Sequence, residues 1–117
     1  MTPETRYTIA FIAAKLVNPD SEQMAIYDSS IGTRHFNGDV NESYVNLSES
    51  YAGNITGSGS SKYFSSIRCD GTGEEFSLRV SGSSFDGSVG SEQFRGSVSG
   101  NQVRFDSGEN YQRSEEH

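Results

Sequence analysis

The sequence predicts an α+β fold that is mostly β, in which one N-terminal helix packs on a strongly curved antiparallel meander of about eight short strands. Three observations carry this prediction. An apolar segment near the N-terminus has helical spacing, short alternating segments follow it, and 13 glycines in 117 residues supply frequent turns. At this length we expect a single domain, residues 1–117, with one hydrophobic core.

Residues 3–17 are expected to form the helix. Thr2 can cap the first turn, and Pro3 is tolerated at the first helical position. Apolar side chains recur through this segment so closely that they cover most of the helix surface. Asn18 should end the helix, because a residue that precedes proline disfavours the helical conformation. The alternative is a closed β-barrel in which the N-terminal segment is itself a strand, since Tyr, Thr, Ile and Phe also favour sheets.

The remainder of the chain has the period-two alternation of half-buried strands. The expected strands are residues 24–28, 34–40, 44–48, 62–69, 75–80, 85–89, 93–98 and 101–106. Within 62–69, strict alternation would place Tyr63 and Ile67 on one face and Phe64 and Arg68 on the other. Residues 50–61 are rich in glycine and serine and are expected to form a flexible loop, and residues 112–117 a disordered tail.

The unit Phe-x-Gly-x-Val occurs three times, and period two places its glycine on the apolar face between Phe and Val. A glycine in a strand weakens it unless the backbone must bend or another group must come close. We therefore expect sharp curvature of the sheet, or a helix lying across the glycine row. The three glycines are Gly38, Gly87 and Gly96.

The composition argues against several classes of partner. The formal net charge is −7, and an acidic surface repels nucleic acid and anionic membranes. No segment approaches the roughly 20 apolar residues that span a bilayer, and no signal peptide is recognisable, so we expect a soluble chain.

The sequence contains no recognisable catalytic, metal-binding or cofactor-binding constellation. Its two histidines are His35 and His117, and no serine lies in a Gly-x-Ser-x-Gly elbow. The one cysteine, Cys69, is expected to be a buried strand residue. We therefore expect no enzymatic activity, no metal and no cofactor.

Four arginines fall opposite the apolar residues if period two holds: Arg68, Arg79, Arg95 and Arg104. Guanidinium groups bind carboxylates and phosphates in a bidentate manner, so this polar sheet face is the expected binding surface. The simpler interpretation is cross-strand pairing of these arginines with Glu75, Asp86 and Asp106.

We thus expect a non-catalytic interaction module whose partner is a protein or a small anionic ligand. One alternative is a carrier of a small apolar ligand, with a cavity between helix and sheet. A second alternative is a hydrolase that uses unidentified carboxylates.

Overall fold

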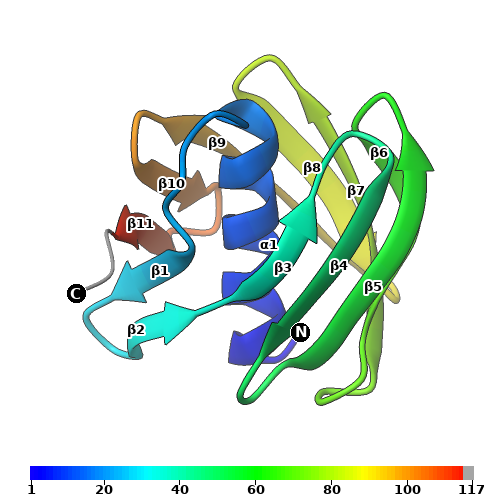
Figure 1. Ribbon diagram of the computed structural model, residues 1–117, viewed down its shortest axis with the longest axis horizontal. Coiled ribbons are helices and arrows are strands. Elements are labelled where there is room, and N and C mark those ends of the chain that lie inside the picture. The colour runs from blue at the N-terminus through cyan, green and yellow to red at the C-terminus, as the bar shows by residue number, and fades with distance from the viewer. Residues whose placement is uncertain (115–117) are drawn as a thin grey trace.

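The computed structural model describes residues 1–114, in which one helix, α1 (Pro3–Val17), is surrounded by an antiparallel sheet (Figure 1). The sheet has 11 strands in the order β2-β1-β11-β10-β9-β8-β7-β6-β5-β4-β3. The strands are β1 Ala25–Asp28, β2 Gly32–His35, β3 Asn37–Val40, β4 Tyr44–Glu49, β5 Gly53–Ser60, β6 Tyr63–Cys69, β7 Glu74–Ser81, β8 Ser84–Val89, β9 Glu92–Ser99, β10 Gln102–Phe105 and β11 Asn110–Ser114.

The predicted helix is confirmed, with the same first and last residues. The side chain of Thr2 caps it by accepting a hydrogen bond of 3.1 Å from the backbone N–H of Thr5. At the other end, the N–H of Asn18 donates to the carbonyl of Ala14 at 2.9 Å. Ten of the 15 helical residues are buried, and they lie all around the helix axis. A helix that is apolar on every side must be enclosed on every side.

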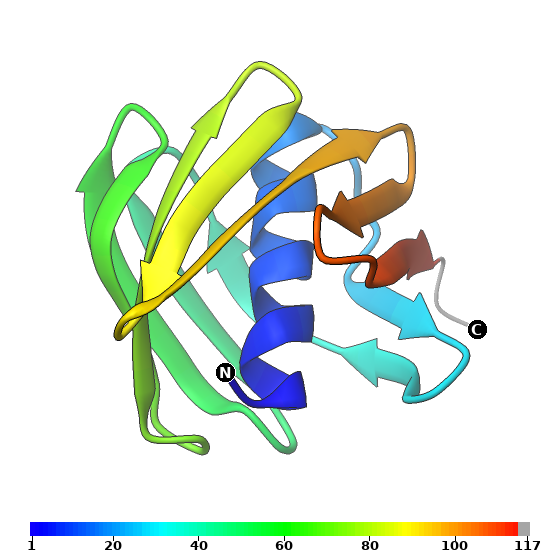
Figure 2. The same cartoon turned by 180° about the vertical axis from the view of Figure 1, so that it is seen from behind.

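The sheet encloses the helix by curving until its two edges meet. The edge strands β2 and β3 follow one another in the chain and are separated only by Phe36. β2 pairs with β1 and β3 pairs with β4, while the N–H of Phe36 donates to the carbonyl of Met24 at 2.9 Å. Figure 2, the view from behind, shows the yellow-to-orange strands β8 and β9 on the viewer's side of the helix, whereas β3 lies on the opposite side, towards the viewer of Figure 1. The result is a nearly closed, barrel-like sheet with α1 inside it.

Two segments that composition predicted to be irregular are strands. Residues 53–60 were expected in a flexible loop, but they form β5, which pairs with β4 and β6. Its glycines make room for side chains of β6: a Cβ on Gly57 would lie 2.8 Å from Ile67, and one on Gly59 would lie 2.7 Å from Phe64. The expected tail from residue 112 is also corrected, because β11 extends to Ser114 and pairs with β1 and β10. Residues 115–117 lie outside the described part.

The alternation expected in residues 62–69 is wrong because β6 contains a bulge. The pairing of β6 with β7 shifts register between Phe64 and Ile67. An extra residue in one strand reverses which side chains point inward. Phe64 and Ile67 are therefore both fully buried, whereas Tyr63 lies on the outer face of the sheet and is 51% exposed.

The two C-terminal Phe-x-Gly-x-Val units pair with each other, so that each phenylalanine lies opposite the other unit's glycine. The register of β8 and β9 places Phe85 opposite Gly96 and Gly87 opposite Phe94. A Cβ on Gly96 would lie 2.6 Å from the Phe85 ring, and one on Gly87 would lie 2.7 Å from the Phe94 ring. The backbone carbonyls of Ser77 and Arg104 also lie within reach of a Cβ at Gly87 and Gly96, respectively, so the close groups belong to neighbouring strands and not to the helix.

The glycine of the third unit, Gly38, has a different role. It is exposed and has a φ of +118°, a backbone conformation that residues with a side chain rarely adopt.

Buried polar contacts join the helix to distant strands. The hydroxyl of Tyr7 donates to Oε1 of Glu49 at 2.5 Å, and the same oxygen accepts from the N–H groups of Tyr51 and Ala52. Near the helix C-terminus, the guanidinium of Arg113 donates to the carbonyls of Ala14 and Gln23 at 3.2 and 3.0 Å.

Gly96→Val should destabilise the fold, because its side chain would meet the Arg104 carbonyl oxygen at 2.3 Å as well as the Phe85 ring. Overpacking of this kind typically costs about 1–3 kcal/mol. Chemical denaturation of the variant should therefore give a lower free energy of unfolding. Ser97→Val, at the exposed neighbouring position, is the matched control and should change stability little. Equal stability of the two variants would contradict this packing of Gly96.

Tyr7 should make the protein less stable at alkaline pH. Burial, and then its hydrogen bond to Glu49, raises the pKa of Tyr7 above the ordinary value. Above about pH 10 the unfolded chain loses this proton while the folded chain keeps it, so stability falls by up to about 1.4 kcal/mol per pH unit. Burial also raises the pKa of Tyr111, which adds to the fall.

Urea unfolding at a series of alkaline pH values checks this expectation. Tyr7→Phe should lower stability at neutral pH by about 1 kcal/mol, through the lost hydrogen bond, yet flatten the alkaline decline. Tyr63→Phe, which changes an exposed ring, serves as the control. An alkaline decline as steep in Tyr7→Phe as in the unmodified protein would rule out Tyr7 as a source of it.

Candidate binding groove on the outer sheet face

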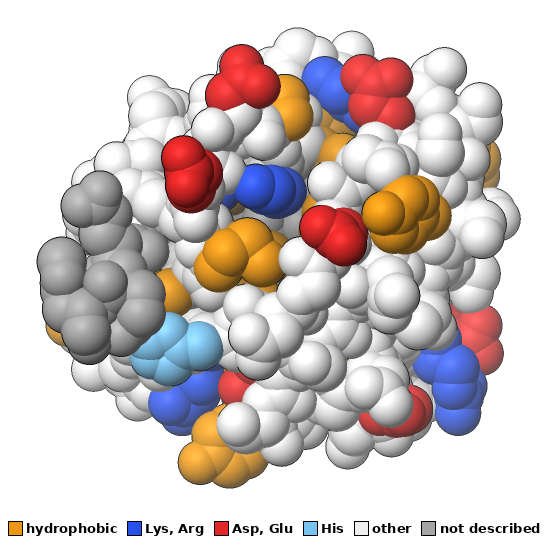
Figure 3. All heavy atoms as spheres, viewed as in Figure 1, with side chains coloured by type: hydrophobic (Ala, Val, Ile, Leu, Met, Phe, Trp, Pro, Cys, Tyr) orange, Lys and Arg blue, Asp and Glu red, His pale blue; other side chains and the backbone are white. Residues whose placement is uncertain are grey.

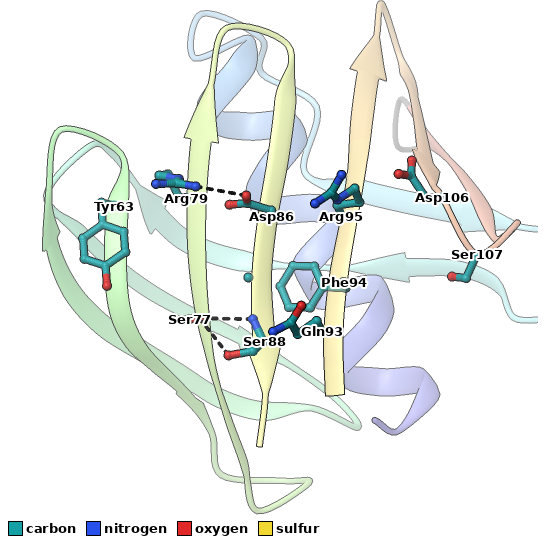
Figure 4. A pocket seen from close by; sticks show the side chains of 11 residues that line it. Tyr63, Ser77, Arg79, Asp86, Ser88, Gln93, Phe94, Arg95, Asp106 and Ser107 are labelled. Atoms are coloured by element: carbon teal, nitrogen blue, oxygen red, sulfur yellow. Dashed lines mark hydrogen bonds and ion pairs between the residues drawn. The ribbon is translucent and has the colours of Figure 1, made fainter. Parts of the chain in front are cut away.

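A groove of about 610 Å³ lies on the outer face of strands β6–β10 (Figure 4). Its lining is mostly polar and combines both signs of charge with hydroxyl groups. The lining residues are Tyr63, Ser77, Arg79, Asp86, Gly87, Ser88, Gln93, Phe94, Arg95, Asp106 and Ser107.

The centre of the groove is a row of side chains from the successive strands β6–β9, which ends at Asp106 in the turn after β10. The strand register places Tyr63 opposite Arg79, Arg79 opposite Asp86, and Asp86 opposite Arg95. The N–H of Asp106 donates to the carbonyl of Arg95 at 2.9 Å, which brings Asp106 to the end of the row. Because neighbouring strands are about 4.8 Å apart, the row is about 19 Å long. Its charges alternate in sign from Arg79 to Asp106.

The two arginines of the row differ in their contacts. Nη2 of Arg79 lies 3.1 Å from Oδ2 of Asp86, and this hydrogen bond raises the pKa of Arg79. Arg95 is exposed and forms no hydrogen bond or ion pair with another side chain within residues 1–114. Figure 4 shows its guanidinium between Asp86 and Asp106 with no interaction to either. The N–H donors of the Arg95 guanidinium are therefore available to a molecule bound in the groove.

Hydroxyl and amide groups flank this row on one side. Ser77, Ser88 and Gln93 are opposite one another in the register of β7, β8 and β9. The hydroxyls of Ser77 and Ser88 are 3.2 Å apart, and the N–H of Ser88 donates to the Ser77 hydroxyl at 3.1 Å. These groups can both donate and accept hydrogen bonds.

A second hollow, of about 550 Å³, adjoins the row and shares Arg79, Asp86, Arg95 and Asp106 with the first. The shared row is thus accessible from both hollows.

The structure brings together only two of the four arginines that the sequence indicated. All four are exposed, but Arg68 lies outside the groove and pairs with Glu75 at 3.1 Å. Nε of Arg104 donates to Asn110 at 3.1 Å, and Arg104 lines a separate hollow beside β1 and β11. The groove therefore contains Arg79 and Arg95.

Asp86 and Asp106 were expected on this face as pairing partners of the arginines, whereas Tyr63, Ser77, Ser88 and Gln93 were missed. Tyr63 was assigned to the apolar face because the bulge in β6 could not be foreseen. Ser77 shares the face of Arg79 by period two, and Gln93 shares that of Arg95, so alternation alone could have found both.

Two further hollows, of about 540 and 500 Å³, lie beside β1 and β11 and beside the C-terminal end of α1. In the view of Figure 3, side chains of both charges are interspersed, and hydrophobic side chains form small separate patches. Within residues 1–114, no group of three or more His, Cys, Asp or Glu side chains could hold a metal ion. The one helix of this part of the chain is too short to cross a membrane.

The chain was compared with known proteins at three levels. No protein-family model, no curated protein and no solved structure matches it. The geometry of the groove is therefore the basis for any functional proposal.

Cys69 should be unreactive in the folded protein. Its side chain is fully buried, and burial, with a smaller contribution from the charge of Glu74, raises the pKa of the thiol to about 12. Because the thiolate is the reactive form, a disulfide reagent such as DTNB should modify Cys69 at about pH 8 only as fast as the chain unfolds. The same reagent should react at once in guanidinium chloride. Rapid modification of the native protein would contradict this burial.

Proposed function

We propose that the protein is a non-catalytic binding module that holds its partner in the groove over β6–β10. The observation that carries the proposal is the exposed guanidinium of Arg95, which has no side-chain partner among residues 1–114. A guanidinium presents five N–H donors in a fixed plane, and here they point into a groove of about 610 Å³. Grooves of this volume are typical of small-ligand sites.

The neighbours of Arg95 support the same role. Arg79 pairs with Asp86 at 3.1 Å, which restrains its side chain within the row before any partner binds. Fixed polar groups lose less conformational entropy on binding than mobile ones. Most of the site is thus built on the paired strands β6–β9, which favours specific recognition, and only Asp106 and Ser107 come from a turn.

The interior of the barrel gives little support to a carrier of apolar ligands. Ile9, Phe11 and Ile12 of α1 are fully buried in it. The ring of Phe11 stacks on Phe36 with centroids 4.2 Å apart. The helix side chains therefore occupy the space that such a ligand would need, and the outer groove is the better-supported binding surface.

Charge reversal tests the proposal. A mixture of small probes that carry carboxylate, amide and hydroxyl groups is titrated into ¹⁵N-labelled protein, and amide chemical shifts are followed. We expect at least one probe to perturb signals of β7–β9 around Arg95, and Arg95→Glu to abolish that response by placing three carboxylates side by side. Arg95→Glu should lower the thermal unfolding midpoint only slightly, because the substituted side chain is exposed and each like-charge contact costs less than about 1 kcal/mol.

Arg68→Glu is the control, since Arg68 is also exposed on the outer face but lies outside the groove. Its response to the probes should be unchanged. The proposal is overturned if no probe perturbs the groove, or if Arg95→Glu responds as strongly as Arg68→Glu.

A further inference from the structure

We infer that the ligand of this groove is a neutral carbohydrate chain. The inference rests on the proposed binding function and goes further by assigning the class of ligand. Three properties of the row from Tyr63 to Asp106 support it: its net charge, its order of donors and acceptors, and its aromatic end.

The charge of the row favours a ligand without charge. Arg79 and Arg95 contribute two positive charges, and Asp86 and Asp106 contribute two negative ones, so the row is formally neutral. A phosphate or carboxylate drawn to Arg95 would approach carboxylates on both neighbouring strands, at a spacing of about 4.8 Å. It would also approach a chain of net charge −7. A neutral ligand is repelled neither by the neighbouring carboxylates nor by the net negative charge of the chain.

The order of hydrogen-bonding groups suits a chain of hydroxyls. Guanidinium groups only donate and carboxylates only accept, and here they alternate from strand to strand. A sugar hydroxyl both donates and accepts, so adjacent hydroxyls can bind an arginine and an aspartate in turn. Ser77, Ser88 and Gln93, beside the row, can satisfy further hydroxyls in either sense. A ligand with acceptors alone would offer no donor to Asp106, whose carboxylate accepts from no other side chain among residues 1–114.

The end of the row at β6 supplies an apolar surface. Tyr63 lines the groove and is 51% exposed. Figure 4 shows its ring separated from Arg79 and standing at the margin of the lining side chains. An exposed tyrosine ring offers a flat apolar face beside a polar tip. Such a face matches the C–H face of a sugar ring, whose hydroxyls project from its edge.

The experiment compares neutral and charged probes on the full chain. The neutral probes are maltotriose, cellotriose and tri-N-acetylchitotriose, and the charged probes are trigalacturonic acid, tetraglutamate and inorganic phosphate. Binding is followed by ¹⁵N chemical shifts, including the Nε–Hε signals of arginine side chains. We expect at least one neutral trisaccharide to bind at the groove with a dissociation constant on the order of 1 mM.

Substitutions in the groove and a change of salt concentration test this mode of binding further. Arg95→Ala should weaken binding about tenfold through the lost charged hydrogen bonds, and Tyr63→Ala should weaken it by a similar factor. Arg68→Ala should bind like the unmodified protein. Raising NaCl from about 50 mM to about 500 mM should leave the affinity nearly unchanged, because no ligand charge is screened.

The outcomes separate this inference from the proposed function. If the charged probes bind at the groove and lose affinity with salt while the neutral ones do not bind, the carbohydrate assignment is overturned and the binding module remains. If no probe of either class perturbs the groove at about 20-fold above the expected dissociation constant, both fail.

Discussion

The structure depends on the burial of a helix that is apolar on every side. A flat sheet can cover one side of such a helix and leaves the others in water. Full burial of each large apolar side chain stabilises the fold by about 1.5–3 kcal/mol, so enclosing Ile9, Phe11, Ile12 and Leu16 together outweighs the cost of bending the sheet. The meander therefore continues around the helix until β1 pairs with β11 and the edge strands β2 and β3 join through Phe36.

An enclosed helix must also satisfy the polar groups at its ends. At the N-terminus, Glu74 accepts from the N–H and hydroxyl of Thr2. Near the C-terminus, Arg113 is fully buried without a carboxylate partner among residues 1–114, and burial lowers the pKa of its guanidinium. Its donors are placed on backbone carbonyls near the negative end of the helix dipole, which offsets part of the cost of burying the charge. The helix is thus held in one axial position.

The curvature that encloses the helix also determines the outer groove. On the inner face of the curved sheet, Gly87 and Gly96 leave room for the rings of Phe94 and Phe85, and a Cβ at either position would also meet a backbone carbonyl of the next strand. Each inward position has an outward neighbour, so Asp86 and Arg95 are held by the same packing. The fold and the candidate site are therefore coupled through adjacent residues. The phenylalanine rings inside the barrel fix the register of β8 and β9, and the same register aligns the charged row on the outer face.

Sequence signals predicted the structure where they were local. Thr2, Pro3 and Asn18 fixed both helix ends, because capping and the residue before proline act within one turn. The flexible loop that composition predicted was wrong for β5, because the glycines of this strand make room for side chains of β6.

The candidate site was predicted only in part for the same reason. The pairing of Arg79 with Asp86 follows from alternation, but the place of Tyr63 depends on one bulge within β6. A bulge reverses the faces of a strand on one side of it, and its position is decided by how β6 matches β7 rather than by any motif in β6. The position of Tyr63 at the end of the groove therefore depends on strand pairing. Strict alternation along the sequence places Tyr63 on the wrong face of the sheet.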